Sequence, residues 1–143
     1  MNPSRILPDL QCSLLCEEVR QEINGNFLLI GVFNSLRVPQ LPVVVNLCLF
    51  NRWTAGFGQF VESVRLLAPD QTTVLRKGEI NFSLQDVTHN RTTVGFWGQL
   101  KFEIAGAYYV EVLVDDVMKI RLPFLVQVVT PVPPPTGGPK KGQ

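Results

Sequence analysis

The chain has 143 residues, 45% of them hydrophobic, and its 13 Lys and Arg residues balance 12 Asp and Glu residues to a net charge of +1. A nucleic-acid binder usually carries a clustered basic excess, so this balance argues against nucleic acid as a partner. Because no apolar run reaches the roughly 18 residues of a spanning helix and no signal-peptide core lies near the N-terminus, we expect a soluble, cytoplasmic protein without membrane contact.

The first predicted strand follows a short N-terminal extension, residues 1–9. Residues 10–16 alternate apolar and polar side chains, as a strand with one buried side requires. Residues 17–23 also suit a short helix, but we favour a strand that ends in a turn at Asn24-Gly25.

The next predicted strands differ in how their apolar residues are spaced. Residues 27–33 and 43–50 are nearly continuous apolar runs bounded by turn residues, which is typical of strands buried on both faces. Residues 60–66 and 79–85 alternate instead, so we expect each to bury only one side.

The clearest alternation lies in residues 92–104. The side chains of one parity are expected to face the core: Val94, Phe96, Leu100, Phe102 and Ile104. Alternation resumes over residues 110–114 and 118–128 on either side of a short polar turn, which predicts a hairpin. With no amphipathic helical window between them, these seven to eight strands predict an all-β, two-sheet antiparallel sandwich over residues 10–130.

One local motif makes an immunoglobulin-like sandwich the favoured topology. Residues 106–112 read Gly-Ala-Tyr-Tyr-Val-Glu-Val, in which Tyr108 stands two residues before the inward-facing Val110. This spacing resembles the tyrosine corner of immunoglobulin-like domains, although no inter-sheet pair of cysteines accompanies it.

The composition changes after Thr130. Residues 131–143 are rich in Pro, Gly and Lys and cannot bury a core, so we expect a disordered, flexible tail that begins in a polyproline-like conformation. Such a segment is suited to docking into an aromatic groove through Pro133, Pro134 and Pro135, and a simple linker explains it equally well.

The residues that carry chemistry form no convincing catalytic or metal site. Cys12, Cys16 and Cys48 lack a fourth ligand, because the single histidine, His89, lies in a predicted loop. Free cysteines are most often core residues, and a loop histidine beside Asp86 is most often a solvated one. We therefore expect no metal, no cofactor and no enzymatic activity.

Some apolar residues stand at positions that the alternation turns away from the core, and exposed apolar area usually marks an interaction surface. These residues are Trp97, Tyr109, Leu113, Leu125 and Val129. Our first hypothesis is a protein-binding or self-associating module, such as a scaffold component, that uses this face or the tail. Packing against the second sheet explains the same residues about as well.

Two further hypotheses remain open. A sugar, a lipid or another small molecule would bind in loops at one end of the sandwich, around residues 53–59 and 88–93. An enzyme ranks last, because it requires distant polar residues to converge on His89 or Cys48.

The N-terminal string from Cys16 to Phe33, Cys-Glu-Glu-Val-Arg-Gln-Glu-Ile-Asn-Gly-Asn-Phe-Leu-Leu-Ile-Gly-Val-Phe, is followed closely by Pro39 and Pro42. With residues 106–112 and the region of Pro123, it resembles an uncharacterised bacterial domain-of-unknown-function family of small single-domain proteins. The resemblance covers about residues 10–128. It implies a compact β-sandwich of bacterial origin and assigns no functional residue.

Overall fold

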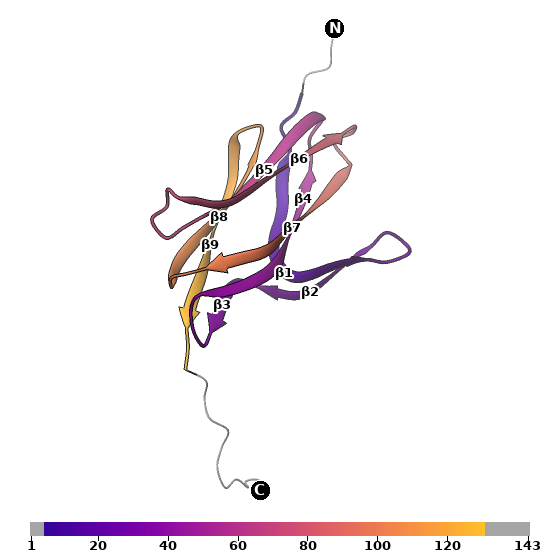
Figure 1. Ribbon diagram of the computed structural model, residues 1–143. Helices are drawn as coiled ribbons and strands as arrows, with labels where there is room; N and C mark the ends of the chain where they lie inside the picture. Colours follow the sequence, from indigo (N-terminus) through magenta and orange to yellow (C-terminus); the bar gives the residue numbers. More distant parts are fainter. Residues whose placement is uncertain (1–4, 131–143) are drawn as a thin grey trace, which may run out of the picture.

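The computed structural model describes residues 5–130, and this part of the chain is all-β, with nine strands in two sheets and no helix (Figure 1). The strands are β1 (Asp9–Gln21), β2 (Phe27–Phe33), β3 (Ser35–Val38), β4 (Val43–Thr54), β5 (Gly58–Leu67), β6 (Val74–Leu84), β7 (Asn90–Phe102), β8 (Gly106–Val114) and β9 (Val117–Val128). The expected tail, with Pro133, Pro134 and Pro135, lies outside the described residues.

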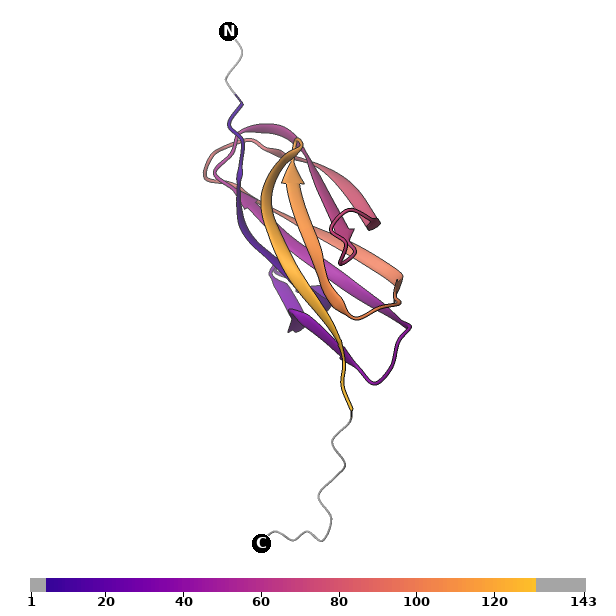
Figure 2. The same cartoon turned by 90° about the vertical axis from the view of Figure 1, so that its left-hand side faces the viewer.

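Two sheets divide these strands. One has the order β2-β1-β4-β7 and the other the order β3-β9-β8-β5-β6. In Figure 2, β8 and β9 lie in front of the strands of the first sheet. All neighbouring strands are antiparallel except β3 and β9, which run parallel. The short strand β3 is the addition to the seven or eight expected strands, because four residues are too few for their alternation to indicate a strand.

The N-terminal region is a strand throughout, since β1 includes most of the segment that also suited a helix. The first half of β1 pairs with β4 and the second half with β2, so one strand serves two neighbours in succession. Upstream of β1, Ile6 exchanges two backbone hydrogen bonds of 2.9 Å with Phe57, and the Arg5 guanidinium pairs with Asp115.

The core lies between the inner faces of the two sheets and is rich in aromatic rings. Trp53 stacks on Phe82, with ring centroids 5.5 Å apart. Phe102 meets Tyr108 edge to face at 4.9 Å. The Tyr108 hydroxyl donates a 2.6 Å hydrogen bond to the backbone oxygen of Ile104, which is the contact that the tyrosine-corner spacing predicted.

A bulge in β7 overturns part of the predicted alternation. Val45 pairs with Leu100 but Leu47 pairs with Trp97, so β7 carries one more residue than β4 over this stretch. After the bulge, Leu100 and Phe102 face the core as predicted, but Ile104, which lies beyond the end of β7, is exposed and its prediction is wrong. The residues before the bulge have the opposite parity. Val94 and Phe96 are therefore exposed and Trp97 is buried, contrary to the sequence prediction.

Candidate functional site

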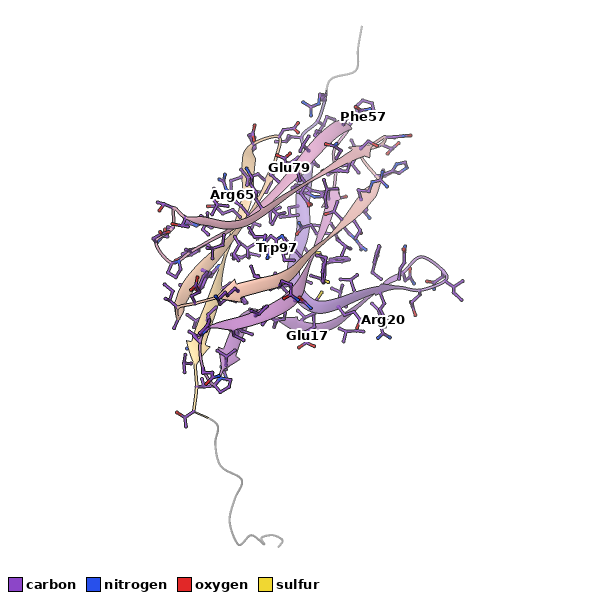
Figure 3. The ribbon with its side chains drawn as sticks, in the orientation of Figure 1. Glu17, Arg20, Phe57, Arg65, Glu79 and Trp97 are labelled. Carbon is purple, nitrogen blue, oxygen red and sulfur yellow. The ribbon has the colours of Figure 1, made fainter. Side chains whose placement is uncertain are left out.

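A cleft lies between the two sheets where β6 and β7, the edge strands, face each other. Its volume is about 250 Å³. The residues that line it come from four strands: Leu49 from β4, Glu62 and Val64 from β5, Arg76, Lys77, Gly78, Glu79 and Ile80 from β6, and Gly95, Phe96 and Trp97 from β7. Figure 3 shows Trp97 between β7 and the β5–β6 hairpin.

A buried carboxylate stands at this cleft. Glu62 is only 2% exposed, yet it lines the cleft. Its Oε1 accepts hydrogen bonds from Asn51 Nδ2 at 3.1 Å, from Trp53 Nε1 at 2.7 Å and from Thr93 Oγ1 at 2.5 Å. Because Glu62 belongs to the five-stranded sheet and all three donors to the other, this network joins the two sheets across the core.

The β7 bulge directly follows Trp97, which lines the cleft, and is held by side chains of two strands. Arg76 Nη2 donates to the backbone oxygens of Gly98 at 3.0 Å and Gln99 at 3.2 Å. Asn46 Oδ1 accepts from the backbone nitrogen of Gln99, which has a positive φ of 54°. These bonds satisfy backbone groups that the bulge removes from the ladder, and they fix Trp97 in its inward position.

Two glycines line the cleft. On β6, Gly78 lies on the same inward side as Arg76 and Ile80. On β7, Gly95 lies on the same inward side as Thr93. A Cβ atom added at Gly78 or Gly95 meets no atom within 4 Å, so both positions border open space.

The predicted interface residues do not form one surface. Trp97 and Leu113 are each only 7% exposed, so their predicted outward exposure is wrong. The bulge in β7 explains why Trp97 is buried. Leu113 belongs to the central strand β8, next to a register shift, and has Ser63 and Met118 as cross-strand neighbours. On such a strand both sides are covered by flanking side chains.

The other predicted interface residues are more accessible. Leu125 and Val129 are exposed, as predicted. Tyr109 is half-buried, because the Arg121 guanidinium lies 4.3 Å from the centroid of its ring. Beside it, Glu111 pairs with Arg65 at 2.7 Å and with Arg121 at 3.6 Å. Charged groups therefore interrupt this face.

A second group of exposed apolar residues lies on the outer side of the other sheet, where the Arg52 guanidinium lies 5.5 Å from the centroid of the Phe50 ring. Leu14 and Val94 flank the buried Phe50 in one cross-strand row, and Phe96, which is 64% exposed, stands opposite Cys48 in the next. Val44 is also exposed on the same side of β4. We call Leu14, Val44, Val94 and Phe96 the apolar face.

The three cysteines are free thiols, and within residues 5–130 no group of His, Cys, Asp and Glu side chains could hold a metal ion. Cys16 and Cys48 are directly paired across β1 and β4 and are both buried. Burial raises the pKa of Cys16, and the neighbouring Cys48 raises it further, so this thiol stays protonated at neutral pH.

We therefore expect maleimide at pH 7 to modify the half-buried Cys12 first and to modify Cys16 and Cys48 only when the protein unfolds. Mass spectrometry would then count one adduct in buffer and three in urea. Rapid addition of three adducts to the folded protein would contradict this assignment.

Two hollows lie beside the loops proposed for a small ligand: one of about 630 Å³ has Gln59 and Arg91 in its lining, and one of about 420 Å³ lies around His89. His89 lines a depression with Thr88, Asn90 and Arg91, in a turn that Asp86 organises. The hydroxyl and backbone of Thr88 hold the pKa of Asp86 below its usual value, with a smaller effect from His89. Asp86 therefore acts as a turn residue in this structure.

Sequence reasoning missed Glu62, although a signal was present. The alternation in residues 60–66 places Phe60, Glu62 and Val64 on the same inward side, and a carboxylate at an inward position indicates a buried polar network. Nothing local predicted its partners, because they come from two strands of the other sheet.

The fold and this site define an all-β, two-sheet protein with a carboxylate buried beside an open cleft. The chain belongs to a family of unknown function, DUF6941, whose model matches residues 11–127. This confirms the predicted membership of an uncharacterised family, whereas the bacterial origin stays a prediction. No curated protein matches the chain. The described part of the chain has no helix that could cross a membrane.

Proposed function

We propose that the protein is an immunoglobulin-like β-sandwich that acts by binding protein and not by catalysis, and that its apolar face is the binding surface. The observation that carries the proposal is the exposure of Phe96 and Val94 on β7 and of Leu14 on β1, the two strands that flank β4. Contiguous exposed apolar area of this kind usually marks a protein interface.

Two features support the immunoglobulin-like topology. The order β9-β8-β5-β6 matches the G-F-C-C′ order of variable-type domains, and the β4–β7 pair matches strands B and E. The hydrogen bond from Tyr108 to Ile104 stands at the start of β8, where immunoglobulin-like domains have their tyrosine corner.

A second copy of the chain is the partner that the charge balance favours. With a net charge of +1, two copies repel each other only weakly. The four residues of the apolar face are uncharged, so a symmetric contact would bring no like charges together through them.

We expect sedimentation velocity to show a dimer that Phe96→Ser converts to monomer at micromolar concentration. The matched control is Val117→Ser, because Val117 is 46% exposed on the other sheet. This control should leave the dimer intact. A wild-type chain that stays monomeric at millimolar concentration would contradict self-association, as would equal weakening by both substitutions.

A further inference from the structure

We propose that the cleft between β6 and β7 binds a small alkylammonium group, with Glu62 as its counter-ion and Trp97 as an apolar wall. Burying a carboxylate is costly unless it is paired, and buried acidic residues are rarely left without a cation. No ion pair involves Glu62 within residues 5–130, where the five ion pairs use other acidic residues.

The hydrogen bonds to Glu62 are one-sided. All three donors bond to Oε1, and Oε2 receives no hydrogen bond from the described residues. Oε2 is not enclosed, because the enclosed side-chain atoms without a partner in this part of the chain are Ser13 Oγ and Asn51 Oδ1, so Oε2 is accessible from the cleft. Asn51, Trp53 and Thr93 are also neutral, so none of them supplies a compensating charge. Since Glu62 lines the cleft, a cation there would complete the charge and hydrogen-bond requirements of this carboxylate.

The positively charged side chains nearest to the cleft do not form an ion pair with Glu62. The Arg76 guanidinium already donates to the carbonyls of the β7 bulge. Lys77 and Glu79 are exposed at the rim with opposite charges, and Figure 3 shows Glu79 on the side of β6 that faces away from Trp97. Glu62 is therefore the buried acidic group that lines the cleft without an ion pair, and Arg76, which also lines it, has no ion pair within residues 5–130 either.

The remaining walls suit a short alkyl chain. Leu49, Val64 and Ile80 are aliphatic, and the indole of Trp97 attracts a cation that contacts its face. The volume of about 250 Å³ is below the roughly 300–1,000 Å³ of pockets for drug-sized ligands. A primary amine on a chain of a few carbons matches both the size and the chemistry.

The two tryptophans allow a direct test by NMR. The indole N–H of Trp53 donates to Glu62, and Trp97 lines the cleft, so both indole signals report on the proposed site. Titration of the full chain with n-butylammonium chloride should shift the Trp53 indole signal saturably. Equal concentrations of n-butanol or NaCl should not, because they lack the ammonium group.

Two variants separate binding from folding. Glu62→Gln should weaken the butylammonium response at least tenfold, and Gly78→Leu should do the same by filling the cleft. A Cβ added at Gly78 would meet no atom within 4 Å, and the φ of Gly78 is not positive, so this variant should fold with its Glu62 network intact. An absent response in the wild type, or an undiminished one in folded Gly78→Leu, would overturn the proposal.

A second probe, a lysine blocked at both backbone ends, distinguishes a lysine side chain of another protein from a free small amine as the ligand. Binding at least as tight as that of butylammonium would assign the site to a lysine side chain, and weaker binding would assign it to a free amine. Phe96 borders both the cleft and the apolar face, so amine binding is measured on the monomer, at a concentration at which sedimentation shows no dimer. Gly78→Leu leaves Leu14, Val44, Val94 and Phe96 unchanged, and sedimentation reports on that face separately.

Discussion

Glu62→Ala is expected to lower the free energy of unfolding by about 3–5 kcal/mol, because it removes the acceptor shared by three buried donors. Asn51 and Trp53 are almost fully buried, so neither regains a hydrogen bond to bulk water. Asn51 already has one buried oxygen, Oδ1, without a partner. Urea denaturation followed by tryptophan fluorescence measures the loss.

Two controls define what this loss means. Glu62→Gln keeps an oxygen that accepts hydrogen bonds, so it should cost clearly less than Glu62→Ala. Glu79→Ala removes an exposed carboxylate on the adjacent edge strand and should change stability by less than about 0.5 kcal/mol. A cost below about 1 kcal/mol for Glu62→Ala would mean that water enters through the cleft and satisfies the donors.

The network and the cleft have to be understood together. Replacing a buried polar cluster with apolar residues of similar volume often leaves stability unchanged or increases it, so stability alone does not account for a carboxylate at this position. Its position beside a cleft bordered by two glycines suggests a binding role, and Glu62→Gln distinguishes the two contributions through separate measurements of stability and amine binding.

The sequence predicted most strands, because apolar alternation depends directly on which side of a strand is buried. The prediction that residues 27–33 are buried on both faces was wrong, because they form the edge strand β2, where Leu28 and Val32 are exposed. The other failures lie where the ladder is irregular. In β1 the register shifts between Leu10 and Cys12, and the bulge in β7 follows Trp97. A bulge reverses the parity of each residue on one side of it, and the only local indication here was Gly98.

The candidate site was less predictable than the fold. Glu62 could be flagged from its inward parity, but the donors on β4 and β7 lie 9 to 31 residues away in the chain. The cleft depends on which strands end at the sheet edges, and the position of β6 opposite β7 is a property of the topology. Periodicity carries no information about that arrangement.

The β7 bulge predicts unequal effects for Phe96 and Phe102, which are an even number of residues apart but lie on opposite sides of the bulge. Phe102→Ala should cost about 3–5 kcal/mol, because Phe102 is fully buried and contacts the rings of Tyr108 at 4.9 Å and Phe124 at 5.6 Å. Phe96→Ala should change the stability of the monomer by no more than about 1 kcal/mol, since most of that side chain is exposed.

Urea denaturation at a protein concentration low enough to keep the chain monomeric provides the comparison. An unbroken strand would place Phe96 and Phe102 on the same buried side, and both substitutions would then be strongly destabilising. Equal costs would thus contradict the bulge and, with it, the outward position of Phe96 on the apolar face. A large difference would establish that the one extra residue between Trp97 and Leu100 decides which aromatic ring supports the fold and which is free to bind.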